Sequence, residues 1–139
     1  MCGIVGILEK NKKHIDLKEL SRFNNSLSHR GPDSYGIYLN KEKNLGLGHR
    51  RLSIIDLREV GNQPMTAFDR FTIVFNGEIY NFHQLKKELT ELGHKFKSNS
   101  DTEVLLKSYV QWGEECQLKF NGMWAFSIWD DLKKRTFYL

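Results

Sequence analysis

Hydrophobic residues recur along the chain with two different spacings, which predict a mixture of strands and helices. Apolar, β-branched runs over residues 2–8, 34–39, 45–52 and 71–75 are typical of strands. Apolar positions at helical spacing over residues 17–27 and 85–92 predict two amphipathic helices, and Gly93 is expected to end the second. The segment 40–44 is expected to be the turn that pairs the second and third strands.

The C-terminal third of the chain predicts one further helix and a hairpin. Ser100-Asp101-Thr102-Glu103 fits a capping box ahead of the apolar run 104–110. Residues 123–129 and 136–139 are expected to pair around the turn 130–135. Strands and helices come in blocks rather than in strict alternation, which favours an α+β fold with mainly antiparallel sheets. The chain stops within an apolar strand, so residues 1–139 are expected to form one domain that is incomplete at its C-terminus.

Composition and charge narrow the classes of protein. With 139 residues, 40% hydrophobic and 27% charged, the chain is a globular domain rather than a disordered or fibrous one. The net charge of +4 comes from scattered lysines and arginines, which favours a solvated surface over a nucleic-acid interface. The N-terminus has no signal-peptide pattern and no apolar run is long enough for a membrane span, so a cytoplasmic location is expected.

Two patterns that suggest cofactors do not hold up. Leu45-Gly46-Leu47-Gly48 hints at a dinucleotide-binding loop, but the third glycine is replaced by Arg51 and no helix is expected to follow. The five histidines show no metal-ligand spacing, so we expect no metal site. The two cysteines, Cys2 and Cys116, exclude a disulfide framework.

Cys2 is the first candidate for chemistry. Cysteine is small enough for the initiator Met1 to be removed, which would place a thiol and a free α-amine on one residue. An α-amine has a reference pKa of about 7.7–8.0, so part of it is neutral at cellular pH and can act as a base. An N-terminal nucleophile therefore needs no separate histidine. The alternative is an ordinary first residue of a buried strand.

Asn76 and Gly77 follow the predicted strand 71–75, and the pair is typical of two different features, an oxyanion hole and a hairpin turn. An asparagine amide and a glycine N–H are two donors that can stabilise one oxyanion, and glycine allows a close approach. Asn-Gly is equally a strong hairpin signal. A helix rather than an obvious partner strand is expected to follow, and at this point both interpretations stay open.

One arginine and two acids match the needs of an α-amino acid substrate. Arg50 and Arg51 interrupt an apolar stretch, where an arginine either forms a salt bridge or binds a carboxylate bidentately. Glu78 and Asp101 can bind an ammonium group, although an acid such as Asp101 in a first helical turn usually favours the helix dipole.

Six short strings occur in an order that resembles one protein family. The strings are Met1-Cys2-Gly3-Ile4-Val5-Gly6-Ile7, Ser28-His29-Arg30-Gly31-Pro32-Asp33, Arg51-Leu52-Ser53-Ile54-Ile55-Asp56, Gln63-Pro64-Met65, Asn76-Gly77-Glu78-Ile79-Tyr80-Asn81 and Ser100-Asp101-Thr102-Glu103. With these strings, the sequence resembles the glutaminase domain, a class II glutamine amidotransferase, of glutamine-hydrolysing asparagine synthetases, and the resemblance runs along the whole chain.

The resemblance implies a fold, a reaction and a set of roles. The fold would be the four-layer αββα sandwich of N-terminal-nucleophile hydrolases, and the reaction the hydrolysis of L-glutamine to glutamate and ammonia. Cys2 would be the nucleophile, with Asn76 and Gly77 as the oxyanion hole. Arg51 would bind the substrate carboxylate, rather than Arg50. Glu78 and Asp101 would bind its ammonium group. The backbone of Leu52, Ser53, Ile54 and Ile55 would line the pocket, and Arg30-Gly31-Pro32-Asp33 would support it.

The resemblance also implies partners that lie outside residues 1–139. Relatives carry an ATP-dependent synthetase domain that receives the ammonia, and a homodimer is compatible with the family. No cofactor is expected for the glutaminase part, while ATP and Mg²⁺ belong to that absent domain. A related amidotransferase with another carboxylate acceptor and a catalytically inactive fragment remain alternatives.

Two further alternatives are not enzymes. One is a binding or regulatory module, which the presence of Cys2 and Asn76 disfavours. The other is an interaction protein that uses Trp112, Trp124 and Trp129, although aromatic residues at such spacings are usually core. We interpret Cys116 as structural, because Glu114 and Glu115 beside it disfavour a thiolate.

Overall fold

The computed structural model describes residues 2–11 and 14–139. Seven strands, three α-helices and two 3₁₀-helices lie within these ranges. In chain order they are β1 (Gly3–Leu8), α1 (Leu17–Ser26), β2 (Ser34–Leu39), β3 (Leu45–Arg51), η1 (Glu59–Gly61), β4 (Met65–Ala67), β5 (Phe71–Ile79), α2 (Phe82–Glu91), α3 (Asp101–Trp112), η2 (Gly113–Lys119), β6 (Gly122–Asp130) and β7 (Arg135–Tyr138).

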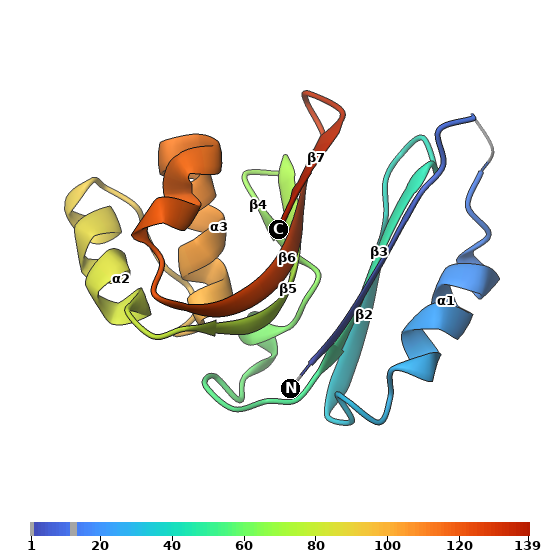
Figure 1. The fold of residues 1–139 in the computed structure, drawn as a ribbon, viewed down its shortest axis with the longest axis horizontal. Helices are drawn as coiled ribbons and strands as arrows, with labels where there is room; N and C mark the ends of the chain where they lie inside the picture. The colour runs from blue at the N-terminus through green and yellow to red at the C-terminus, as the bar shows by residue number, and fades with distance from the viewer. Residues whose placement is uncertain (1, 12–13) are drawn as a thin grey trace.

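The elements form four layers, as the resemblance implied. One sheet has the strand order β1-β3-β2 and the other β4-β5-β6-β7, and every pairing is antiparallel. In Figure 1, α1 covers the outer face of the three-stranded sheet, and α2 and α3 cover the outer face of the four-stranded sheet. The two sheets face each other between these helical layers, so the expected α+β class and αββα order are confirmed.

Two glycines let α1 pack closely on the three-stranded sheet. A Cβ atom on Gly46 would lie 2.7 Å from the side chain of Leu20, and one on Gly48 would lie 3.0 Å from the Asn24 side chain. Leu20 and Asn24 are the buried residues of the helix. The Gly46 and Gly48 pattern therefore serves helix packing.

Apolar side chains fill the layers on both sides of the four-stranded sheet. Leu45 and Leu47 of β3 meet Val74 of β5 and Trp129 of β6 between the sheets. A larger cluster, which includes Ile73, Leu105 and Phe126, fills the space between β5, β6 and the helices α2 and α3. Trp112 and Trp124 pack half-buried against this second cluster. The tryptophans are therefore core residues rather than a shared docking face.

Most predicted elements are confirmed, but β5 differs in a way that concerns the site. The strand does not end at Phe75 but continues to Ile79, and it stays paired with β6 along that length. Asn76-Gly77 is thus not a hairpin turn, because Gly77 pairs with Trp124 in the middle of a ladder. Three short elements have no counterpart in the prediction, namely the three-residue strand β4 and the two 3₁₀-helices. The helix α2 begins three residues before its predicted first residue.

The helices are short. The longest, α3, has 12 residues. No helix in the described ranges is both long and apolar enough to cross a membrane.

Candidate active site

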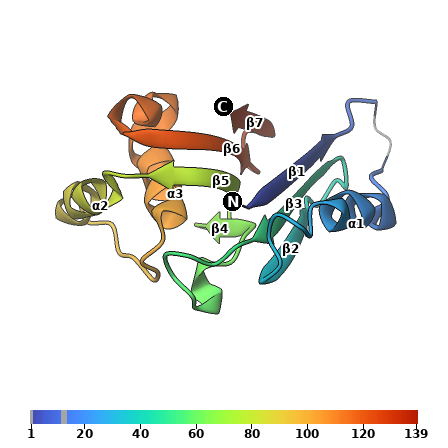
Figure 2. The same cartoon turned by 60° about the horizontal axis from the view of Figure 1, so that its bottom comes forward.

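A cavity of about 160 Å³ opens near the N-terminal end of β1, where that strand meets β5. Figure 2 shows this end of β1 beside the four-stranded sheet. All predicted site residues except Ser53 line the cavity. The lining residues are Cys2, Arg51, Leu52, Ile54, Ile55, Asp56, Gly61, Gln63, Phe75, Asn76, Gly77, Glu78, Tyr80, Ser100, Asp101, Thr102 and Met123.

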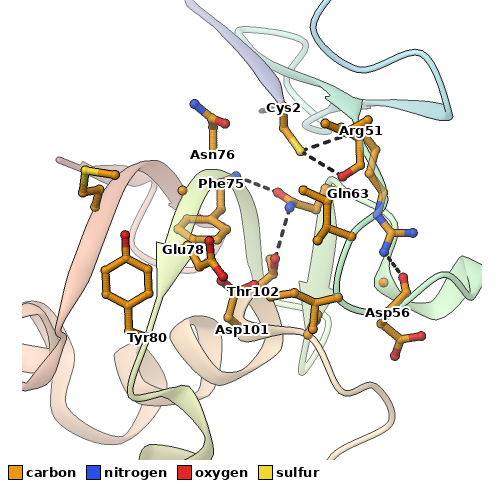
Figure 3. Close-up of a pocket in the computed structure, with 17 residues that line it drawn as sticks. Cys2, Arg51, Asp56, Gln63, Phe75, Asn76, Glu78, Tyr80, Asp101 and Thr102 are labelled. Carbon is orange, nitrogen blue, oxygen red and sulfur yellow. Dashed lines mark hydrogen bonds between the residues drawn. The ribbon is translucent and has the colours of Figure 1, made fainter.

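Cys2 immediately precedes β1 and is only half-buried, so its thiol is accessible from the cavity. The N–H of Leu52 donates to its Sγ over 3.4 Å, and the Leu52 carbonyl lies 3.7 Å from the same sulfur (Figure 3). The Arg30 guanidinium donates through Nε to the Cys2 carbonyl at 3.0 Å. The sulfur is therefore fixed beside the segment that follows β3.

The segment 30–33 packs against the backbone around the end of β3 and does not line the cavity. Its Gly31 packs directly on the end of β3, since a Cβ atom there would lie 2.3 Å from the carbonyl carbon of Arg50. The Asp33 N–H donates to the Arg51 carbonyl at 3.0 Å, and the Asp33 carboxylate accepts from the Ser53 N–H at 2.7 Å. The segment thus fixes the backbone on both sides of Leu52.

Ser53 is the one predicted site residue outside the cavity lining. Its backbone N–H is taken by Asp33, so it is not available to a substrate.

The Arg51 side chain is buried at the wall of the cavity and holds the loop that follows it. Its Nη1 donates to the Arg58 carbonyl at 3.1 Å and to Asn62 Oδ1 at 2.8 Å, and its Nη2 donates to the Asp56 carbonyl. These contacts use three of the five guanidinium N–H groups. Nε–H and one Nη2–H make no hydrogen bond within the described residues, so one edge remains for a carboxylate.

Arg50 lies on the other face of the sheet. Its Nε donates to the Asn24 carbonyl at 3.1 Å, and its guanidinium lies over the Tyr35 ring at 4.8 Å. Neighbouring residues of a strand face opposite sides, so only one of the two arginines can reach the cavity. Arg51 lines the cavity and Arg50 does not, and the role of Arg51 in binding a carboxylate stays a prediction.

Asn76 and Gly77 lie within β5. Gly77 is required by the close approach of β6, because a Cβ atom there would lie 2.3 Å from the Met123 carbonyl oxygen. Its φ is not in the left-handed region, so close packing rather than an unusual turn explains the glycine. Figure 3 shows Asn76 near Cys2, and both residues line the cavity.

The pairing of β5 with β6 turns a row of backbone N–H groups toward the cavity side. The Tyr80 N–H donates to the Asn121 carbonyl, so with alternating ladder bonds the N–H groups of Phe75, Gly77 and Ile79 point away from β6. Phe75 N–H donates to Gln63 Oε1 at 2.6 Å, and Ile79 N–H donates to Asp101 Oδ2 at 3.2 Å. The Gly77 N–H lies between these two occupied donors on the same edge of β5, and Gly77 is a lining residue of the cavity.

Two carboxylates lie together on the side of the cavity away from Arg51. Figure 3 shows Glu78 of β5 beside Asp101, the first residue of α3. Burial raises the pKa of Asp101 to about 6, and the neighbouring Glu78 charge adds to that shift. A cation placed between the two would relieve this cost, so the pair is suited to bind an ammonium group.

Sequence reasoning assigned no role to several residues that build the cavity. The Asp56 carboxylate accepts from Arg58 Nη2 at 2.7 Å and from the Asn99 N–H at 2.8 Å, which ties the loop after β3 to the start of α3. Gly61 accommodates the Arg51 guanidinium, since a Cβ atom would lie 2.6 Å from Nη2. Asp56 and Gln63 stood inside the recognised strings, but their contacts depend on the tertiary fold.

Cys116 is structural, as expected, but for a different reason. Full burial raises the pKa of its thiol to about 12, and the adjacent glutamates contribute no resolved part of that shift. Within residues 2–11 and 14–139, no three His, Cys, Asp or Glu side chains gather as metal ligands.

Comparison with known proteins identifies relatives of the whole chain. The chain is 42% identical over 141 residues to glutamine-hydrolysing asparagine synthetase 3 of Bacillus subtilis, covering 99% of this chain and 22% of the relative. It is 46% identical over 134 residues to asparagine synthetase 1 of the same organism, covering 94% and 21%. The chain thus spans about a fifth of the length of these relatives.

A solved structure and a family profile agree with these relatives. Glutamine phosphoribosylpyrophosphate amidotransferase from B. subtilis superposes with a TM-score of 0.72 at 20% identity, over 92% of this chain and 35% of that one. This likeness shows that the two chains share a fold, with two facing sheets between helical layers. Residues 1–139 match the family described as a glutamine amidotransferase domain. The chain therefore belongs to the glutamine amidotransferase domain family and is homologous to asparagine synthetases.

Proposed function

We propose that this domain hydrolyses L-glutamine with Cys2 as the nucleophile, after removal of Met1. One observation carries the proposal. A single cavity is lined by an accessible thiol, an open backbone donor at Gly77, a guanidinium edge at Arg51, and a carboxylate pair on the side away from it.

The charges of the cavity match the two ends of an α-amino acid. Arg51 Nε–H and Nη2–H bind the α-carboxylate, and Glu78 and Asp101 bind the α-ammonium group. Binding of the ammonium favours the ionised form of Asp101, whose pKa is about 6 in the free protein. With both ends fixed, the side-chain carboxamide points to Cys2.

The reaction then follows from the groups around the sulfur. The Cys2 thiol transfers its proton to its own α-amine, and the thiolate adds to the carboxamide carbon of glutamine. The carbonyl π electrons move to oxygen, where Gly77 N–H and the Asn76 amide donate to the oxyanion. The C–N bond breaks as the α-ammonium returns the proton to the leaving nitrogen, which releases ammonia and leaves a thioester. Water adds to the thioester and releases glutamate and the thiol.

We further propose that residues 1–139 are a type 2 amidotransferase domain that supplies ammonia to a synthetase part of a longer protein. The relatives are named as asparagine synthetases, and this chain spans about a fifth of their length. Any requirement for ATP and Mg²⁺ belongs to that part, and aspartate is the proposed acceptor. To distinguish aspartate from another carboxylate acceptor, the longer protein is supplied with glutamine, ATP and each candidate acid, and the acid that becomes amidated is identified.

The test of glutamine hydrolysis is a product assay on three forms of the protein. The wild type is expected to release glutamate and ammonia in equal amounts. Cys2→Ala is expected to bind glutamine without hydrolysing it, and Cys116→Ala serves as the matched cysteine control with wild-type turnover. Hydrolysis by Cys2→Ala at the wild-type rate would overturn the proposal.

A further inference from the structure

Both polar backbone groups of Phe75 are held by buried side chains from outside its own sheet. The N–H donates to Gln63 Oε1 at 2.6 Å, and the carbonyl accepts from His49 Nε2 at 3.1 Å. Gln63 is 7% exposed and His49 is fully buried. β4 pairs with β5 only as far as Ile73, so no strand within the described residues covers the edge of β5 at Phe75. We call Gln63, His49 and the Phe75 backbone the Phe75 clamp.

The Gln63 side chain is oriented at both ends. Its Nε2 donates to Thr102 Oγ1 at 3.1 Å, which leaves Oε1 for the Phe75 N–H (Figure 3). An amide with one donor and one acceptor partner has only one satisfactory orientation. Gln63 therefore links the segment before β4 to β5 and to the first turn of α3.

His49 approaches the same residue from the opposite sheet. It lies on β3, two residues before Arg51, and its Nε2–H crosses the space between the sheets to the Phe75 carbonyl. Burial lowers its pKa to about 4, so the imidazole is neutral at pH 7 and Nε2 carries the proton that the carbonyl accepts. The clamp thus joins the strand that carries Arg51 to the strand that carries the oxyanion donors.

We propose that Gln63 and His49 are positioning residues for the oxyanion hole. Phe75 directly precedes Asn76 and Gly77, and the two side chains bind both its N–H and its carbonyl on the edge of β5 that faces away from β6. An oxyanion donor is effective only within about 2.7–3.1 Å of the developing charge, so a small shift of this backbone weakens both donors. The inference rests on the proposed glutamine hydrolysis, and neither residue touches the reacting atoms.

The first test is steady-state kinetics of Gln63→Met in the complete chain. Methionine has a similar length and no group for Phe75 N–H or Thr102. We expect kcat to fall about tenfold or more, with KM for glutamine within about twofold, because the loss acts on the transition state. Gln63→Glu keeps an oxygen at Phe75 N–H and is expected to recover part of kcat. Gln111→Met, on the exposed face of α3, is the matched control with wild-type values.

The second test separates positioning from a general loss of structure. Addition of Cys2 Sγ to the aldehyde carbon of L-glutamate γ-semialdehyde moves the π electrons to oxygen, which takes up the thiol proton by way of the α-amine, and forms a tetrahedral hemithioacetal. L-Glutamate binds the same pocket without that step. In Gln63→Met we expect about tenfold weaker inhibition by the aldehyde and unchanged inhibition by glutamate within about twofold. Thr102→Val, which removes only the contact to Gln63 Nε2, is expected to show the same split to a smaller degree.

The outcomes distinguish the two proposals. Absence of glutamine hydrolysis in the wild type overturns the proposed function and the clamp with it. Hydrolysis in the wild type with an unchanged kcat in Gln63→Met overturns the clamp alone. An equal loss of aldehyde and glutamate binding in both Gln63→Met and Thr102→Val also overturns it, since that result indicates damage to the pocket rather than to the oxyanion donors.

Discussion

At the scale of single residues, the proposed mechanism separates groups that bind the substrate from groups that stabilise its transition state. In that proposal Asn76 and Gly77 donate to the oxygen that becomes charged. Arg51, Glu78 and Asp101 bind the two ends of the substrate. Each set comes from different elements, so each can be changed separately.

Asn76→Ala tests the transition-state role. Loss of one oxyanion donor typically costs about 2.7–4 kcal/mol in activation free energy, so we expect kcat to fall about 10²–10³-fold while KM changes little. Steady-state ammonia release over a range of glutamine concentrations measures both parameters. If KM rises as much as kcat falls, Asn76 is a binding group and its assigned role is wrong.

The pH dependence of KM tests the role of Asp101. Its pKa of about 6 in the free protein means that the carboxylate is ionised above pH 6 and protonated below it. Because the substrate ammonium favours the ionised form, KM is expected to rise as pH falls through 6, by up to about tenfold per unit. Asp101→Asn is expected to have a high KM with no such pH dependence. A flat wild-type KM between pH 8 and 5 would contradict this role.

At the scale of elements, the two periodicities predicted most strands and helices because burial on one face leaves a regular pattern. The hydrophobic pattern gave a wrong end for a strand whose extent depends on packing against a neighbouring strand. Asn76-Gly77 carries a turn signal, yet close packing against Met123 and Trp124 extends the strand through it. Only three residues form β4, which is too short to leave a period.

The site was predictable to a similar extent. Cys2, Arg51 and Asp101 stand in recognisable strings, and the fold brings them to one cavity. The contacts of Gln63 and His49 were not predictable, because a polar residue in a loop or strand shows no sign of burial until two sheets meet over it.

A prediction at this scale concerns the connection between α1 and β2. Gly31→Ala would place a Cβ atom 2.3–2.5 Å from the backbone of Arg50 and Arg51, so the end of β3 must move. We expect a loss of about 1–3 kcal/mol in unfolding free energy and a higher KM for glutamine. Gly93→Ala is the control, since its φ of 93° strains an alanine in open space away from the cavity. A similar KM change in both variants would refute the specific effect on Arg51.

At the scale of the whole molecule, two buried groups give stability opposite dependences on pH. The folded state holds the pKa of His49 at about 4, below its ordinary value of 6.5, so its contribution to stability is present above pH 6.5 and is lost as pH falls toward 4. Asp101 has a folded pKa of about 6 against an ordinary value of 3.8, so its cost to stability, present above pH 6, disappears as pH falls toward 3.8.

Because the pKa shifts of His49 and Asp101 have opposite signs, removing either group should change the pH dependence of stability in opposite directions. Each shift corresponds to about 3 kcal/mol, so in the wild type they largely cancel between pH 6 and 4. We expect Asp101→Asn to lose unfolding free energy as pH falls from 7 to 4.5, and His49→Gln to gain it. Urea unfolding at the two pH values measures both. Parallel profiles for the two variants would show that the shifts are not coupled to folding.

We propose Cys2 as the nucleophile of a glutamine-binding pocket, and a labelling experiment can test this role. Intact mass is measured before and after incubation with a diazo-ketone analogue of glutamine, with peptide mapping of the product. We expect loss of Met1 and a single adduct on Cys2 that glutamine suppresses and L-leucine does not. A processed chain whose only adduct lies elsewhere, or whose Cys2 adduct is indifferent to glutamine, would contradict it.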